Sequence, residues 1–233
     1  MRIVSLVPSA TEMLFALGLG DQVVAVTHEC DWPPEAQDLP HATTDVLPQG
    51  LPPGEMDSAV RALTSEGQAI YELDERLLAR LQPDLIVTQS LCAVCAVSAD
   101  DVRAVAERLE SRPEVVSLDP KTLGEVLGDV RTLAQATDVK DAGVDLVQDA
   151  AARIDAVRVK VKDARRPTVA AIEWLDPVFV AGHWTPQLIE YAGGIDLFGL
   201  PGEHSETRTW EEIAAARPDV VVCMPCGYDA ERS

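Results

Sequence analysis

The chain has 233 residues, 47% of them hydrophobic, which is enough apolar material for one large domain or for two lobes of ordinary size. It carries 19 Lys and Arg against 39 Asp and Glu, and the formal net charge of -20 excludes nucleic acid and anionic lipid as partners, because both are repelled. No apolar run approaches the roughly 20 residues that a membrane-spanning helix needs, so membrane insertion is not expected.

The amino-terminal residues predict a buried parallel strand followed at once by a helix. A short apolar run ends at Pro8, as buried strands often do. Ser9 and Glu12 then have the spacing of a capping box, and Gly18 or Gly20 is expected to end the helix. Because the free amides of a helix start attract anions and amides, Pro8 and Ser9 are candidate ligand contacts, with a purely structural cap as the alternative.

The second predicted strand, at residues 22–26, ends in a stretch rich in side chains that coordinate metals or carry charge. These side chains cannot all point into a core, which favours a site, although some of them suit a turn and the indole suits a core cap. The candidate ligand-binding residues of this stretch are His28, Glu29, Cys30 and Trp32.

Two segments far apart in the chain share one pattern: Pro-Asp, an apolar strand, and a Cys-x-x-Cys pair. They cover residues 83–95 and 217–226. In an open parallel α/β sheet, ligands bind just beyond the carboxyl ends of the strands, so both thiol pairs are placed where a site is expected. The candidates from these two strand ends are Gln89, Cys92, Cys95, Cys223, Cys226 and Tyr228.

Residues 1–120 are predicted to form the first α/β lobe. An irregular excursion rich in proline and glycine interrupts it over residues 40–70, with a helix from about residue 56 to 65. An amphipathic helix over residues 73–81 leads into the first Cys-x-x-Cys strand, and a further strand is expected at residues 115–118.

Residues 121–164 are predicted to be connecting helices. A break is expected at Thr137-Asp138, and the second helix would be about 33 Å long, enough to span the side of a small domain. Residues 165–233 are predicted to form a second α/β lobe, and its small number of strands suggests a truncated lobe.

The second lobe supplies further strand-end candidates. Its strand at residues 167–172 ends at Glu173 and Trp174, and a second strand-like stretch runs into His183 and Trp184. Of these, Trp174, His183 and Trp184 are candidate ligand contacts, because aromatic residues are sparse in this chain and large indoles suit a binding site. The N-caps predicted elsewhere in the chain are Ser98, Thr122 with Glu125, Thr185 with Pro186 at N1, and Thr209.

Several short motifs in a fixed order carry a family resemblance: Ser5-Leu-Val-Pro-Ser-Ala-Thr-Glu12 with Leu17-Gly18, Asp31-Trp-Pro33, Leu81-Gln-Pro-Asp-Leu-Ile86, Pro177-Val-Phe179 through Gly182, and Ala192-Gly-Gly194. With them, the chain resembles the solute-binding proteins of ABC importers for cobalamin and ferric siderophores, which are periplasmic binding proteins. The likeness is strongest to the cobalamin-binding branch, and it runs from end to end of the chain.

The resemblance implies an α/β fold of two Rossmann-like lobes with parallel sheets, joined by one long rigid helix, with the ligand between the lobes. It also implies docking on ABC transporter membrane subunits through one acidic residue from each lobe. Glu211 matches in the second lobe, and Glu75 is the nearest acid in the first, where strict spacing falls on Arg76. A monomer is expected.

The residues favour a binding protein over an enzyme. Indoles offer the broad apolar area that a flat macrocycle needs, and thiolate and imidazole ligands suit cobalt, zinc or iron. The chain has no nucleophile elbow, His-Glu-x-x-His stretch or phosphate loop. We therefore expect a corrinoid or other metal chelate as the ligand of a non-enzymatic protein that needs no cofactor.

The alternative hypothesis makes the four paired cysteines a metal site, a cluster site or a thiol redox pair. Its ligands would be Cys92, Cys95, Cys223 and Cys226, with zinc or iron as the metal. A third interpretation is that these thiols act only as small buried hydrophobic groups.

The beginning of the sequence predicts the location. Met1-Arg-Ile-Val enters a strand directly, with no secretory leader before it, so the cytoplasm is expected for the sequence as it stands. Removal of a leader from a longer precursor would instead place the protein in the periplasm or at the cell surface.

Overall fold

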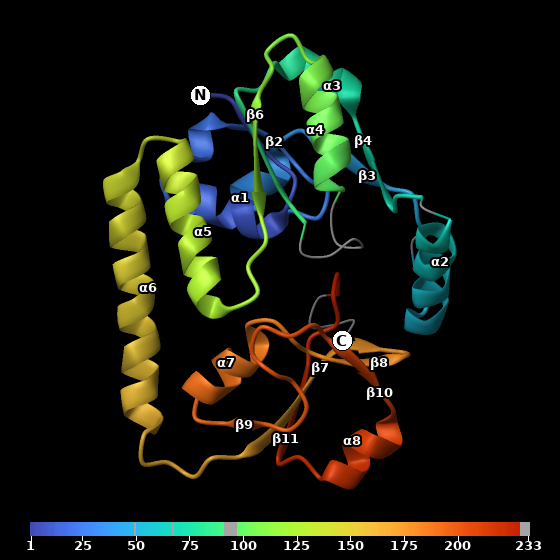
Figure 1. Ribbon diagram of the computed structural model, residues 1–233, viewed down its shortest axis with the longest axis vertical. Helices are drawn as coiled ribbons and strands as arrows, with labels where there is room; N and C mark the ends of the chain where they lie inside the picture. The colour runs from blue at the N-terminus through green and yellow to red at the C-terminus, as the bar shows by residue number, and fades with distance from the viewer. Residues whose placement is uncertain (49, 67, 91–96, 229–233) are drawn as a thin grey trace. The chain divides into compact units, whose positions relative to one another are not determined.

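The computed structural model describes residues 1–48, 50–66, 68–90 and 97–228, and it has the α/β architecture that the sequence predicts (Figure 1). The chain divides into two compact units. Unit 1 comprises Met1–Gly50, Ala59–Asp119 and Asp129–Leu146, and unit 2 comprises Leu51–Ser58, Pro120–Gly128 and Val147–Ser233. The 22-residue helix α6 (Lys140–Val161) passes from unit 1 into unit 2 and so joins them.

Unit 1 is built on a four-stranded parallel sheet with the order β2-β1-β5-β6. Its strands are short runs of mostly β-branched and apolar residues, of the kind that parallel sheets bury on both faces. They are β1 (Ile3–Ser5), β2 (Val23–Val26), β5 (Leu85–Gln89) and β6 (Glu114–Leu118), and each one lies at a strand predicted from the sequence.

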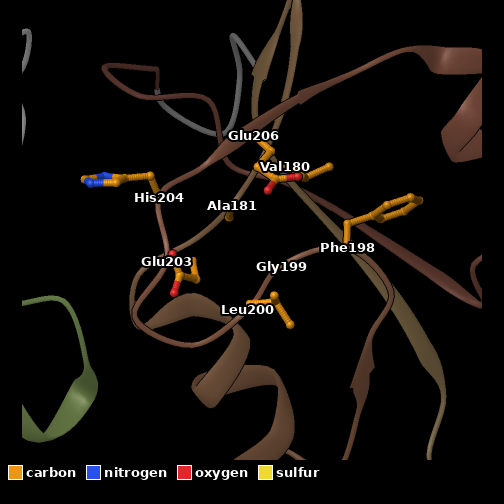
Figure 2. Close-up of a pocket in the computed structure, with 8 residues that line it drawn as sticks. All are labelled: Val180, Ala181, Phe198, Gly199, Leu200, Glu203, His204 and Glu206. Atoms are coloured by element: carbon orange, nitrogen blue, oxygen red, sulfur yellow. The ribbon is translucent and has the colours of Figure 1, made fainter.

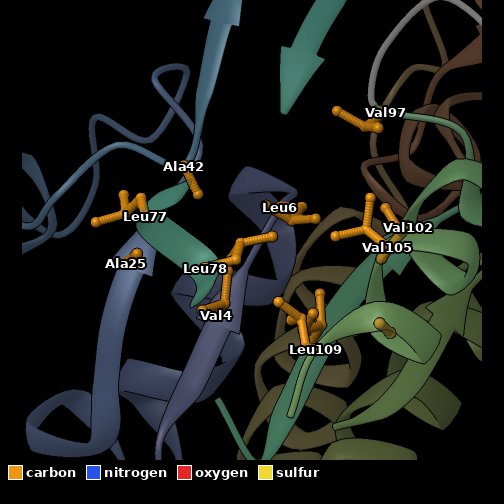
Figure 3. Packing of buried hydrophobic residues seen from close by; sticks show 12 residues of the cluster. Val4, Leu6, Ala25, Ala42, Leu77, Leu78, Val97, Val102, Val105 and Leu109 are labelled. Atoms are coloured by element: carbon orange, nitrogen blue, oxygen red, sulfur yellow. The ribbon is translucent and has the colours of Figure 1, made fainter. Parts of the chain in front are cut away.

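Helices cover this sheet, and their apolar faces form the core of unit 1. Leu78 and Val102 pack against Val4 and Ile86 of the sheet within one buried cluster (Figure 3). The helices of this unit are α1 (Pro8–Ala16), α3 (Glu75–Leu81), α4 (Ala99–Arg108) and part of α5 (Leu123–Ala136). The predicted break at Thr137-Asp138 is confirmed, because α5 ends at Ala136 and α6 begins at Lys140.

The excursion from unit 1 contains a small antiparallel sheet that the sequence did not predict. Strand β3 (Thr43–Asp45) pairs with β4 (Tyr71–Leu73), and helix α2 (Pro53–Ser65) lies between them in the chain. The predicted helix start at Leu73 is therefore wrong, since Leu73 ends β4. Helix α3 begins two residues later, where the Asp74 side chain accepts the amide N–H of Leu77 at 2.8 Å. Two 3-10 turns, Gly20–Gln22 and Pro34–Asp38, complete the first half of the chain.

Unit 2 has a mixed sheet with the order β10-β8-β7-β11, and β9 also pairs with β7. Only β9 and β11 run parallel to β7, while β8 is antiparallel to it. The expectation of a purely parallel sheet is thus wrong here, because Asp176 and Pro177 alone join β7 to β8, and so short a loop can make only a hairpin. The strands are β7 (Thr168–Leu175), β8 (Val178–Val180), β9 (Ile195–Asp196), β10 (Glu206–Arg208) and β11 (Val220–Cys223).

The core of unit 2 lies against one face of this sheet, where Ile213 of helix α8 (Trp210–Ala216) packs on Ala170 and Ile172. Helix α7 (Thr185–Tyr191) precedes β9. Among the described residues, β11 pairs with β7 alone, and Val220 and Val221 are 42% and 46% exposed, although the run of valines is typical of a buried strand.

Most predicted helix boundaries are confirmed, but the N-caps predicted at Ser9 and Thr185 are wrong, as is the start at Leu73. Helix α1 begins at Pro8 with Val7 as N-cap, so Ser9 lies in the first turn and caps nothing; proline suits that turn because its missing N–H would have no partner there. Helix α7 has Trp184 at the N-cap, one residue before the predicted Thr185. The confirmed caps are Ser98, Thr122 with Glu125, and Thr209 with Glu212, and Gly18 follows α1 with a left-handed φ of 76°.

Candidate functional site

The carboxyl ends of the unit 1 strands lie along one edge of its sheet, as the sequence predicts. Ser5 of β1 is level with Val26 of β2 and with Val87 of β5, and all three strands run in the same direction. The segments that follow these strands therefore leave the sheet at the same edge. The predicted residues in them are Pro8, Ser9, His28, Glu29, Cys30, Trp32 and Gln89.

His28 is anchored by neighbours within unit 1. Its Nδ1 lies 2.8 Å from Oγ1 of Thr43, its Nε2 lies 3.3 Å from Oε1 of Glu29, and the Tyr71 ring meets it edge-on with centroids 5.1 Å apart. The hydrogen bond with His28 lowers the pKa of Glu29. The strand end thus presents an ionised Glu29 at the surface beside a fixed imidazole.

Cys30 lies in the core and is only 3% exposed. Its Sγ is 3.0 Å from Oγ1 of Thr11, which donates a hydrogen bond to Oγ of Ser5 at 2.8 Å. Burial raises the pKa of the Cys30 thiol. The thiol is therefore protonated and satisfied inside the protein, where it does not face solvent.

Alkylation of the native protein should spare Cys30. We expect iodoacetamide to modify it at least about 100-fold more slowly than Cys223 or Cys226, because a buried thiol reacts only after local opening. Peptide mapping by mass spectrometry after timed quenching measures the rates. In concentrated urea the three thiols should react alike, and equal rates in the native protein would contradict the buried position.

Two other unit 1 candidates are at the surface. The Trp32 side chain is 59% exposed and Ser9 is exposed, so both can meet a ligand without rearrangement of the core. Pro8 and Gln89 are half-buried. The first thiol pair, Cys92 and Cys95, lies outside the described residues.

In unit 2, an aromatic pair stands at the carboxyl end of β7. The Trp174 and Tyr228 rings have centroids 5.7 Å apart and are tilted by 39°. The Trp174 Nε1 donates to the carbonyl of Asp176 at 3.0 Å, which fixes the indole. The amide of Cys226 donates to the carbonyl of Glu173 at 3.2 Å, so the segment after β11 is tied to the end of β7. Residues predicted from two strands are thereby brought together.

Glu173 precedes Trp174 in β7 and is half-buried. Burial raises its pKa, although a hydrogen bond with the Ser205 side chain opposes part of the shift. The sequence did not single out Ser205, which reaches Glu173 only because β10 folds back along β8. No strand was predicted at residues 206–208, so the polar side chain of Ser205 was the available signal, and it is weak.

His183 and Trp184 follow β8, which runs opposite to β7, so the rule for parallel strand ends does not place them. The amide of Ala181 bonds to the carbonyl of Ala171, which directs the chain back along β7. The His183 ring packs edge-on against His204, with centroids 5.2 Å apart, and lies 6.0 Å from the Trp184 ring. Burial, with smaller effects of His204 and Lys121, lowers the pKa of His183. Its imidazole is therefore neutral at pH 7.

Cys223 and Cys226 are both exposed. The helix context that the thiol redox hypothesis requires is not observed up to residue 228, because Cys226 and Gly227 form a turn in which the amide of Tyr228 donates to the carbonyl of Pro225. Within the described ranges, no three His, Cys, Asp or Glu side chains are grouped so that they could hold a metal ion.

A small cavity lies under the loop that carries His204 in unit 2 (Figure 2). Its volume is about 10 Å³, room for about one water molecule and far too little for a chelate. Its lining residues are Val180, Ala181, Phe198, Gly199, Leu200, Glu203, His204 and Glu206. A larger groove of about 400 Å³ lies in unit 1 beside α4 and β6, away from the strand ends.

The two acidic residues predicted for transporter docking both lie in the first turns of helices. Glu211 is exposed on α8. Glu75 is exposed on α3 and forms an ion pair with Arg108 at 2.8 Å. Across the described residues, no helix combines the length and the apolar character needed to cross a bilayer.

Comparison with known proteins decides the family. Residues 3–233 match the family described as periplasmic binding protein. The chain belongs to this family. The resemblance found in the sequence is therefore confirmed, and it extends over nearly every residue.

Relatives of this periplasmic binding protein carry names of metal-chelate binders. A vitamin B12-binding protein of Vibrio cholerae serotype O1 is 22% identical over 227 residues, which cover 94% of this chain and 69% of the relative. The solved periplasmic vitamin B12-binding protein of Vibrio cholerae has a TM-score of 0.68 and 20% identity, covering 95% of this chain and 75% of that one. The periplasmic heme-binding protein of Roseiflexus sp. RS-1 has a TM-score of 0.69 and 24% identity, covering 95% and 75%.

These structures establish the fold, which agrees with the predicted α/β class. The family and its relatives are named for binding and not for catalysis, in line with the expectation of a non-enzymatic protein. Both solved relatives are described as periplasmic, and the expectation of a cytoplasmic protein gains no support from them.

Proposed function

We propose that this chain is a solute-binding protein that holds a corrinoid, or a closely similar metal chelate, at its strand-end segments. The observation that carries the proposal is the family match over residues 3–233, joined to an aromatic pair at a strand end. Trp174 and Tyr228 offer rigid apolar surface on which a flat macrocycle can lie, and Trp32 offers more. The relatives named for vitamin B12 favour a corrinoid among the chelates.

The proposal extends to uptake. A binding protein of this class would deliver its ligand to ABC transporter membrane subunits, with the exposed carboxylates of Glu211 and Glu75 as its docking contacts. That role belongs in the periplasm or at the cell surface, where the named relatives act.

Titration with cobalamin and with cobinamide, followed by the corrin absorption bands and by tryptophan fluorescence, tests this function. We expect saturable binding, and Trp174→Ala should weaken it at least about tenfold because the substitution removes a rigid aromatic contact. Trp210→Ala is the matched control, since that indole lies on α8 and is 46% exposed. Absence of binding by both corrinoids would reject the proposal.

The thiol-based alternative retains one supporting observation, the exposure of Cys223 and Cys226. Metal analysis of protein purified without added ligand distinguishes it from the first proposal. Stoichiometric zinc or iron that disappears in Cys226→Ser would favour a metal site.

A further inference from the structure

The segments near the strand ends carry more negative than fixed positive charge. In unit 2, residues 173–177, 181–184, 203–206 and 223–228 contain no Lys or Arg, and the positive charge that acts on one of these segments is that of Lys121, which lowers the pKa of His183. Their acidic residues are Glu173, Asp176, Glu203 and Glu206, and Arg208 forms an ion pair with the last of them.

The described segments at the strand ends of unit 1 are acidic as well. Residues 6–9, 27–33, 89–90 and 119 include Glu29, Asp31 and Asp119 and no Lys or Arg. The lowered pKa of Glu29 keeps that carboxylate ionised at neutral pH. Since the whole chain carries a formal charge of -20, a ligand with its own carboxylates would be repelled at every distance within the screening length.

Glu173 is positioned to recognise a neutral polar group. Its backbone carbonyl is fixed by the amide of Cys226, its side chain is held by Ser205, and the next residue, Trp174, stacks with Tyr228. A carboxylate can accept hydrogen bonds from a primary amide, whereas a carboxylate ligand has no hydrogen to donate to it. Burial raises the pKa of Glu173, and a carboxylate ligand would bring a second negative charge into the same desolvated place.

We propose that the ligand of this protein carries neutral carboxamide groups around the edge of its ring. In unit 2, Glu173 is the residue that favours such a ligand over one that carries carboxylates at its edge. The inference rests on the proposed function and narrows it: metal chelates edged with amides, as corrinoids are, should bind, whereas chelates edged with carboxylates, as haem is by its two propionates, should be rejected. Soft-metal coordination has no part in this selection, which depends on charge and hydrogen bonding alone.

Two ligands with the same ring and the same metal test the inference. Dicyanocobinamide carries carboxamides around the corrin, and dicyanocobyrinic acid carries carboxylates at the same positions. We expect the wild-type protein to bind dicyanocobinamide at least about tenfold more tightly, because juxtaposed like charges oppose binding. The ratio should fall as salt is raised from low to high concentration, since screening weakens the repulsion.

The variant Glu173→Gln assigns the effect to one residue. The substitution keeps the shape and removes the charge, so the affinity for dicyanocobyrinic acid should rise at least about threefold while that for dicyanocobinamide changes less. Glu107→Gln, on the exposed side of α4, is the matched control and should leave the ratio unchanged. Circular dichroism verifies that each variant folds, and the comparison of the two ligands on the wild-type protein stands without any variant.

The possible results distinguish a failure of the proposed corrinoid binding from a failure of the proposed selection for carboxamides. If neither corrinoid binds, the proposed function is wrong. If both bind with equal affinity, or if dicyanocobyrinic acid binds more tightly, the function stands and selection for a neutral rim is overturned. A preference in the wild type that Glu173→Gln leaves unchanged would overturn the assignment to Glu173.

Discussion

Leu78→Ala is expected to lower the free energy of unfolding by about 2–5 kcal/mol. The Leu78 side chain is fully buried, and it lies among Val4 and Leu6 in the cluster that joins α3 to the sheet of unit 1 (Figure 3). Truncation removes its transfer free energy and leaves a cavity, because the neighbouring side chains come from a fixed sheet and relax little.

Urea titrations followed by far-UV circular dichroism measure the change at unaltered m-value. Leu200→Ala is the matched control: that leucine is 64% exposed, so the same truncation should change the free energy of unfolding by no more than about 0.5 kcal/mol. A loss below about 1 kcal/mol for Leu78→Ala would mean that the core of unit 1 is not packed around this residue.

The features that the sequence predicts well are those decided by neighbouring residues. The apolar runs that became β1, β2, β5 and β7 indicate strands by themselves, and a capping box such as Thr209 with Glu212 needs only four residues of chain. The same reasoning explains why the N-cap predicted at Ser9 is wrong. Ser9 and Glu12 have the spacing of a capping box, but Pro8 already fits the first turn, so the N-cap is Val7, two residues earlier, and the serine hydroxyl caps no amide.

The features that the sequence did not predict depend on pairing at a distance. Thr43–Asp45 and Tyr71–Leu73 are three-residue strands with no pattern of their own, and they form a sheet only because the chain between them returns to the same place. Likewise, the sequence of Val220–Cys223 does not predict that β11 lies at the edge of the sheet, because the order of the strands decides its position. The exposure of the Cys223 thiol is therefore also not predictable from this segment alone.

The candidate site shows the same division. Trp174, Tyr228 and Cys226 were expected at strand ends, and parallel pairing of β7 with β11 brings their segments together. His183 was expected by the same rule, but β8 is antiparallel, so its position depends instead on contacts with the 202–205 segment. Cys30 was predicted to contact the ligand because it lies between charged residues in the sequence. In the structure its thiol is buried and contacts Oγ1 of Thr11.

Gly182→Ala is expected to cost about 2–4 kcal/mol of unfolding free energy and to weaken dicyanocobinamide binding about tenfold. A methyl group on Gly182 would collide with the backbone of the neighbouring segment: it would contact the carbonyl oxygen of Glu203 and lie 2.6 Å from the carbonyl carbon of His204 and 2.7 Å from the amide of Ser205. Backbone atoms cannot swing aside as the end of a flexible side chain can, so the whole segment must move.

That movement would reach the candidate site. The amide of His183 donates to the carbonyl of Glu203 at 2.7 Å, and the amide of Gly202 donates to the carbonyl of His183 at 2.9 Å, so displacing the segment breaks bonds on both sides. It also draws Ser205 away from Glu173, which leaves the half-buried carboxyl group without this hydrogen bond. Gly128→Ala in α5 is the control, since its methyl group meets nothing within 4 Å and alanine favours a helix, so stability should stay equal or rise by up to about 1 kcal/mol. Urea titration and corrinoid titration of both variants measure the two effects, and unchanged values for Gly182→Ala would show that the 202–205 segment does not hold Glu173 in place.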